Sequence, residues 1–222
     1  MRTLFHLSID PGCRKIRMLL REKQLEFELK AEKIWERREG FLSLNPAGEV
    51  PVLQEDDGTT IPDHQVIVEY LEEAYSETPL LGRDLLDRAE VRRLANWFDV
   101  KFAREVTQNL VEEKIMRRFM GLGEPNSAAI RAGHANIHYH LEYIAWLSER
   151  RRWLAGDDFS LADMAAAAHV SAVDYLGDVP WAEHAGAKDW YARVKSRPSM
   201  RPILADNIAG IAPPKHYADP DF

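Results

Sequence analysis

The chain lacks the features that would place it in a membrane or an oxidising compartment. Its 222 residues include one cysteine, Cys13, so no disulfide can form within the chain. The apolar run at the amino terminus is too short for a signal peptide, and Asp10 and Arg14 soon interrupt it. No stretch approaches the roughly 18–20 apolar residues of a transmembrane helix. We therefore expect a cytoplasmic protein that has no membrane partner.

The chain also lacks an excess of basic residues. It has 29 lysines and arginines against 36 acidic residues, which gives a formal net charge of −7. Binding to a phosphate backbone needs a concentrated basic face, so we expect no nucleic-acid partner. Three short basic clusters exist at Arg92–Arg93, Arg117–Arg118 and Arg150–Arg152, and we interpret them as solvated helix faces. The 45% hydrophobic and 29% charged composition is that of a globular protein.

The first 75 residues alternate between strand and helix patterns. Short apolar or alternating runs predict strands, and apolar residues three or four apart predict helices. Asp57–Gly58 is a strong hairpin-turn signal between the last two strands. The resulting order is β-α-β-α-β-β-α, with strands expected at residues 3–7, 26–32, 50–54 and 59–61 and helices at 12–24, 36–44 and 63–75.

Everything after Asp84 has a helical period and no convincing strand. The first long run places apolar residues three or four apart from Val91 to Val106, and the sequence GLGEPNS at 121–127 breaks it. We therefore predict an α/β domain followed by an all-α domain. The expected boundaries are an amino-terminal domain at 1–78, a linker at 79–83 and a helical domain at 84–222, with a tail at 210–222.

Three short motifs carry the most specific information. In the first, Pro51 has no backbone donor, so a strand must begin there or lie at an edge. A cis bond after Val50 would expose its backbone to an extended peptide, although an ordinary turn proline is the simpler interpretation. In the second, Asp63–His64 opens a helix whose free N–H groups favour a carboxylate, or Asp63 is only the N-cap.

The third motif, FSLADM, is structural. Ser160 and Asp163 have the spacing of a capping box, in which each side chain accepts a hydrogen bond from the other residue's backbone. Phe159 and Met164 have the spacing of the accompanying hydrophobic staple. We expect a buried helix here and assign the motif no catalytic role.

These three motifs, in this order and spacing, resemble the glutathione S-transferase superfamily over almost the whole chain. The resemblance implies the family's fold, a thioredoxin-like α/β domain followed by an all-α domain, and a homodimer. It also implies a glutathione-type site in which a cis Val50–Pro51 pairs with the cysteinyl backbone and the pair Asp63–His64 holds the γ-glutamyl group. The family usually has serine where this chain has His64, which is larger than a compact hydroxyl.

The resemblance also places Asp10 at the family's usual catalytic position. A transferase donates a hydrogen bond to the glutathione thiolate or uses a cysteine nucleophile, whereas an ionised aspartate only accepts and repels a thiolate. Asp10 followed by Pro11 is also a good helix start that needs no ligand. Ser8 and Cys13 are the alternative catalytic candidates, Cys13 because a helix start favours its thiolate.

The sequence GHANIHYH raises the question of a metal. His134 and His138 share a helical face, but His140 lies off that face and no nearby carboxylate completes a set. Because a metal site normally needs three or four convergent ligands, we expect none.

Two further segments have the composition of a partner surface. Trp35 stands beside Arg37 and Arg38, which is typical of an interface anchor, although Trp35 also fits packing within its own domain. The tail contains Asp219, Asp221 and Phe222.

Within the superfamily, the 34–53 segment and this tail are most similar to alphaproteobacterial transferase-like division proteins that bind FtsZ. The leading hypothesis is therefore a homodimeric, FtsZ-binding cell-division factor with weakened or absent transferase chemistry and no required cofactor. The alternative is an active transferase that conjugates glutathione to a small electrophile through Ser8 or Cys13. A weaker third option is a thiol oxidoreductase that uses Cys13.

Overall fold

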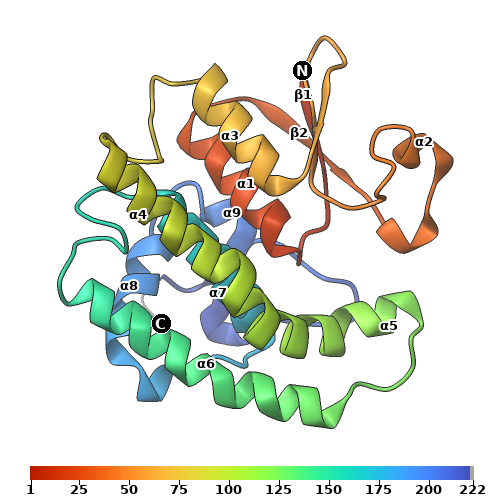
Figure 1. The fold of residues 1–222 in the computed structure, drawn as a ribbon. Helices are drawn as coiled ribbons and strands as arrows, with labels where there is room; N and C mark the ends of the chain where they lie inside the picture. Colours follow the sequence, from red (N-terminus) through yellow and green to blue (C-terminus); the bar gives the residue numbers. More distant parts are fainter. Residues whose placement is uncertain (221–222) are drawn as a thin grey trace. The chain divides into compact units, whose positions relative to one another are not determined.

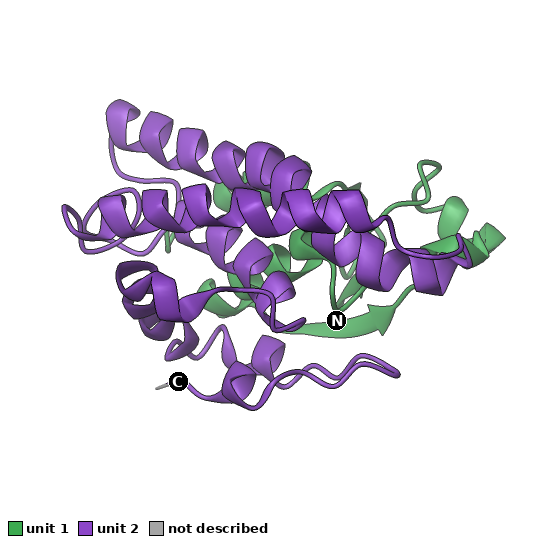
Figure 2. Cartoon of the chain, turned by 90° about the horizontal axis from the view of Figure 1, so that it is seen from below, with its two compact units in different colours: residues 1–79 green, residues 80–222 purple. Residues whose placement is uncertain are grey.

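A computed structural model describes residues 1–220 of the chain. Figure 1 shows the course of the chain, and Figure 2 shows its division into two compact units, residues 1–79 and 80–222. None of the described helices is long and apolar enough to cross a membrane.

Unit 1 is built on a four-stranded mixed sheet with the strand order β2-β1-β3-β4. The first two strands are parallel, and the other two pairs are antiparallel, with Leu4 opposite both Leu29 and Leu53. Helices α1 and α3 pack against each other. The elements are β1 (Arg2–His6), α1 (Pro11–Glu22), β2 (Phe27–Ala31), η1 (Ile34–Glu36), α2 (Glu39–Leu42), β3 (Val52–Gln54), β4 (Thr60–Pro62) and α3 (His64–Ala74). This arrangement confirms the predicted α/β fold.

The segment expected to be one helix at 36–44 is divided. A short 3₁₀ turn, η1, ends at Arg37, whose φ of 45° lies in the left-handed region, and the one-turn helix α2 follows. A left-handed residue cannot continue a right-handed helix, so the chain changes direction at Arg37. The result is a loop that is bounded by β2 and β3 and holds Trp35 and both arginines.

Unit 2 is helical, as predicted. A continuous helix runs through α4 (Leu85–Asn96), the π-type segment η2 (Trp97–Met116) and α5 (Arg117–Met120). Gly121, with a φ of 66°, ends it, and the Asn126 side chain caps the next helix. The remaining elements are α6 (Ser127–Ser148), α7 (Leu161–Asp174), η3 (Trp181–Glu183), α8 (Ala185–Lys195), α9 (Arg201–Leu204) and η4 (Lys215–Ala218).

Helix α7 forms the centre of unit 2. All of its residues are buried, and it packs against α4, η2 and α8. The predicted capping box is present: the Ser160 side chain accepts from the Asp163 N–H, and the Asp163 carboxylate accepts from the Ser160 N–H. Asp163 also accepts from the Leu154 N–H and the Trp190 Nε1–H, both at 3.0 Å. The motif therefore fixes the start of the core helix to two other segments.

Candidate functional site

The candidate site lies in unit 1, where the start of β3 meets the start of α3. The Val50–Pro51 peptide bond is cis. Asp63 has a φ of 74°, and its N–H donates to the Pro51 carbonyl at 3.3 Å. This hydrogen bond holds the first residues of α3 beside the backbone of Val50. The two motifs predicted from the sequence are therefore brought together in one place.

Asp63 is the N-cap of α3. One of its carboxylate oxygens accepts from the Gln65 N–H at 2.7 Å and from the Val66 N–H at 3.2 Å. These are donors that an incoming anion would otherwise use. The side chain is exposed, so it also presents a carboxylate to solvent.

His64 packs against the start of α1. Its Nδ1 lies 2.8 Å from the Nζ of Lys15, a side chain that is almost fully buried. An ammonium group only donates, so Nδ1 accepts and the proton of a neutral imidazole sits on Nε2. A Cβ added to Gly12 would lie 3.0 Å from the His64 ring. The imidazole therefore lies against Gly12 and the Lys15 ammonium of α1.

Lys15 is the site residue that sequence reasoning missed. It is one of the basic residues that stand between the apolar positions of α1, yet it is 2% exposed. Its partner is 49 positions away, and no local pattern links the two.

Asp10 caps α1. Its Oδ1 accepts from the Cys13 N–H at 2.7 Å, and Pro11 occupies the first helical position. The cap explains the residue without a ligand. The same oxygen lies 3.1 Å from a Cβ built on Gly12, so the carboxylate and the His64 ring flank one backbone position.

Cys13 is fully buried, and its sulfur accepts from the Leu7 N–H. Burial, and then the negative charge of Asp10, raise the pKa of the thiol well above its usual value. Both effects disfavour the thiolate, and they outweigh the benefit expected from the helix start. Ser8 is half-buried, and its carbonyl accepts from Arg14 Nε at 2.8 Å. Its hydroxyl makes no hydrogen bond among the described residues.

The candidate partner residues of unit 1 lie in the loop between β2 and β3. Trp35 is half-buried, and Arg37 and Arg38 are exposed. Arg38 forms an ion pair with Glu32, a buried acid at the end of β2. Arg37 has no ion pair or hydrogen bond among the described residues. The loop therefore offers an aromatic side chain and one uncommitted guanidinium.

In the tail, Asp219 is exposed and follows the η4 turn. Asp221 and Phe222 lie outside the described residues.

The three histidines of α6 face different partners. His134 pairs with Asp178 at 3.3 Å, and His138 Nδ1 lies 2.9 Å from His184 Nε2. His140 is buried between Trp97 and Glu105. In the part of the chain that the structure describes, no three metal-binding side chains are arranged to hold an ion.

Comparison with known proteins identifies the family. The model described as "Glutathione S-transferase, N-terminal domain" matches residues 11–74, and "Glutathione S-transferase, C-terminal domain" matches residues 136–198. The chain belongs to the glutathione S-transferase superfamily. The resemblance expected from the sequence motifs is therefore confirmed.

Within the superfamily, the chain is similar over its full length to FtsZ-localized protein A of Caulobacter vibrioides. The two are 49% identical over 224 residues, covering 100% of this chain and 98% of the relative. A solved structure named FzlA from C. crescentus has 49% identity and a TM-score of 0.96, covering 100% of this chain and 99% of that one. A structure named as a glutathione S-transferase from Rhodospirillum rubrum F11 has 57% identity and a TM-score of 0.98, with full coverage of both chains.

Proposed function

We propose that this protein is a cytoplasmic, homodimeric cell-division factor of the glutathione S-transferase fold that binds FtsZ. The observation that carries the proposal is the similarity to FtsZ-localized protein A, at 49% identity over 100% of this chain and 98% of that protein.

The geometry of the site supports weakened transferase chemistry. The carboxylate of Asp10 is used as a helix cap, and an acceptor-only group cannot stabilise a thiolate. Cys13 is buried with a raised pKa. His64, which stands where the family resemblance expects a serine that holds the γ-glutamyl group, is paired with the ammonium of Lys15. The cis Val50–Pro51 bond expected for peptide pairing is present, and we infer that the group that would activate a thiol is not.

We place the FtsZ-binding surface on the loop that carries Trp35, Arg37 and Arg38, together with the carboxyl-terminal residues Asp219, Asp221 and Phe222. A half-buried tryptophan beside an uncommitted arginine combines apolar contact area with a charge that an acidic partner can pair. Arg37 itself has a left-handed backbone conformation, and this conformation sets the direction of the turn in which its side chain is exposed.

For the homodimer, the supporting observation is an exposed aromatic stripe on α6. Tyr139 and Trp146 are 55% and 48% exposed, and with Glu142 and Tyr143 they line a shallow depression of about 360 Å³. Several exposed aromatic side chains on one face of a helix are typical of a protein interaction surface. Light scattering should give the mass of a dimer, and Trp146→Glu should shift the protein toward the monomer.

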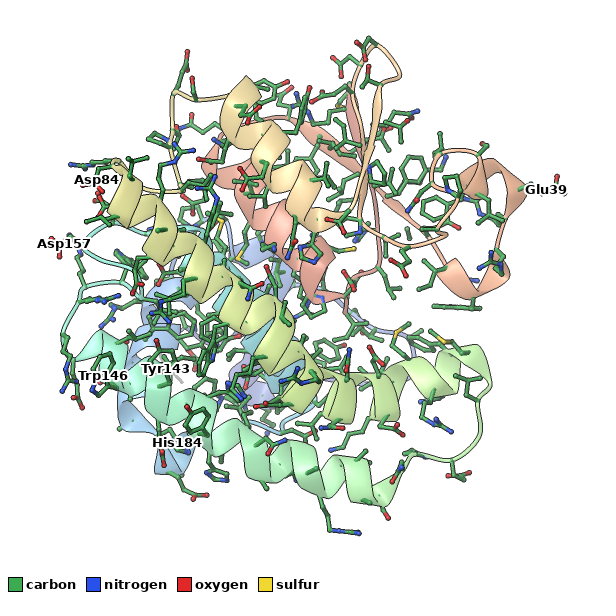
Figure 3. All side chains as sticks on the ribbon, in the orientation of Figure 1. Glu39, Asp84, Tyr143, Trp146, Asp157 and His184 are labelled. Atoms are coloured by element: carbon green, nitrogen blue, oxygen red, sulfur yellow. The ribbon has the colours of Figure 1, made fainter. Side chains whose placement is uncertain are left out.

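Co-sedimentation with polymerised FtsZ tests the main proposal. Trp35→Ala and Asp221→Lys should each reduce the pelleted fraction while leaving the dimer intact. Asp157→Lys is the matched control for the charge reversal, because Asp157 is an exposed acid of unit 2 (Figure 3). If wild-type protein does not pellet with filaments, the proposed function is wrong. If it pellets and neither variant weakens pelleting, the binding surface lies elsewhere.

The second candidate function is an active transferase. The name of the Rhodospirillum rubrum structure and the half-buried hydroxyl of Ser8 favour it. Calorimetry with glutathione separates the two: millimolar or weaker binding agrees with the division factor. Micromolar binding together with turnover that Ser8→Ala abolishes would establish the transferase instead.

A further inference from the structure

The residues after α9 are fastened to unit 2 by buried polar groups. The Ile208 N–H donates to the hydroxyl of Tyr175, which in turn donates to the Ile211 carbonyl, both at 2.8 Å. Tyr217 is fully buried, and its hydroxyl donates to the Ile203 carbonyl at 3.3 Å. Apolar packing alone would hold such a segment loosely, whereas these hydrogen bonds fix its path.

A second set of contacts fastens the segment at its far end. His216 Nε2 lies 2.9 Å from Oδ1 of Asp174, the last residue of α7, and Lys195 Nζ donates to the His216 carbonyl at 2.8 Å. Both Asp174 and Lys195 are buried. The η4 turn is therefore held between the ends of two helices.

This arrangement forms a pocket of about 520 Å³. Its walls come from three segments that meet only because the tail is held in place: the end of α8, the short helix α9 and residues 218–220. The lining residues are Lys195, Ser196, Arg201, Leu204, Ala205, Ala218 and Pro220.

The lining combines positive charge with an apolar surface. Of the described lining residues, two are cationic and none is acidic, in a chain whose net charge is −7. The exposed Asp219 lies between the lining residues Ala218 and Pro220. Arg201 is exposed and has no hydrogen bond or ion pair among the described residues. Lys195 is 1% exposed, and burial lowers its pKa to about 8, against the opposing effect of Asp174 and Asp219. The exposed Arg201 guanidinium therefore lies at a pocket lined mainly by leucine, alanine and proline, while the buried Lys195 ammonium is engaged by the His216 carbonyl.

We propose that this pocket binds a carboxylate carried on an apolar group, with Arg201 as the residue that pairs with the charge. Guanidinium binds carboxylate in a planar, two-pronged geometry, and the low polarity of the neighbouring walls strengthens that pair. The apolar side chains would cover the group that carries the carboxylate. Such a ligand has two sources, a small organic acid or the carboxyl terminus of a protein chain.

The test is a titration of the full-length protein with N-acetylphenylalanine, followed by NMR of alanine methyl groups. Shifts should concentrate at Ala205 and Ala218. The carboxamide of the same compound has the same shape without the charge and should bind much more weakly. Arg201→Gln should weaken binding of the carboxylate about tenfold, the value of one charge-assisted hydrogen-bonded pair.

Arg131→Gln is the matched control, because Arg131 is an exposed arginine of α6 that also has no partner among the described residues. Its affinity for the probe should equal that of wild type. Equal binding of acid and amide, shifts located away from the pocket, or equal weakening by both substitutions would overturn the proposal.

A hexapeptide that ends in a free phenylalanine carboxylate distinguishes the sources. Tighter binding than the single amino acid assigns the pocket to a protein terminus, and weaker binding assigns it to a small acid. Both results support the shared chemistry. This test does not involve FtsZ, so its failure leaves the proposed function untouched.

Discussion

The buried histidine of α6 makes unfolding of the protein sensitive to acid. His140 is fully buried; its Nδ1 accepts from the Trp97 Nε1–H and its Nε2 donates to Glu105, both at 3.1 Å. The ring also packs edge-on against Phe102. A second proton on the imidazole would have to sit on Nδ1, where it would face the indole N–H. Protonation therefore requires the tryptophan hydrogen bond to break.

The magnitude follows from linkage. Burial lowers the pKa of His140 from 6.5 to about 4. Between these values the unfolded chain binds a proton that the folded protein does not, so stability falls as pH falls. The stabilisation is fully present above pH 6.5, and about 3 kcal/mol is lost by pH 4. About 2 kcal/mol of that loss occurs between pH 7 and pH 5.

The assay is urea denaturation of wild type and His140→Gln at pH 7, 6 and 5. The substitution removes this titration and leaves every other titrating group in place, so the difference between the two slopes isolates His140. Wild type should lose about 2 kcal/mol more than the variant between pH 7 and 5. Equal losses in the two proteins would refute the reasoning, because they would mean that the buried imidazole accepts its proton as readily as an exposed one.

Three further predictions concern helix starts. Asp163→Ala should lower the free energy of unfolding by about 4 kcal/mol in a denaturation series, because three buried N–H donors lose their acceptor; a loss near 1 kcal/mol would mean that water replaces the carboxylate. Asp10→Ser should leave stability within about 0.5 kcal/mol, since both residues cap well, whereas Asp10→Ala should cost about 1 kcal/mol. Cys13 should react with a thiol reagent only as fast as the protein unfolds, because its sulfur is buried; rapid labelling of native protein would contradict the burial.

Much of the fold could be predicted because it depends on local signals. The Asp57–Gly58 turn, the proline at 51 and the box at Ser160–Asp163 each act within a few residues, and each appears where its local chemistry requires. The long first helix of unit 2 was also predicted, but its widening into a π-type segment was not. The buried residues of that segment include the adjacent pairs at 106–107, 110–111 and 115–116. An α-helix also allows this spacing, so the pattern carried no distinct signal for the wider helix.

The candidate site was only half predictable. The backbone features at Val50–Pro51 and Asp63 are properties of proline and of a helix start, so the sequence carries them. The contact between Lys15 and His64 depends on how two helices pack, and no local pattern encodes it. The same holds for the burial of Cys13: its reactivity depends on what covers it, and the helix start alone suggested the opposite.

At Asp10 the requirements of the helix start differ from the requirements of thiol chemistry. A helix start at this point needs a side-chain acceptor for the Cys13 N–H, and serine would supply it as well as aspartate does. Serine and aspartate are therefore expected to give similar stability at this position. They differ in their effect on a thiolate, because serine can donate a hydrogen bond to it and an ionised aspartate cannot. If loss of thiol activation is what distinguishes this chain from an active transferase, then Asp10→Ser combined with His64→Ser should bring glutathione conjugation above the wild-type rate, although the loss of the acceptor of Lys15 will lower stability. A double variant that folds, binds glutathione and still shows no turnover would place the missing function outside these two positions.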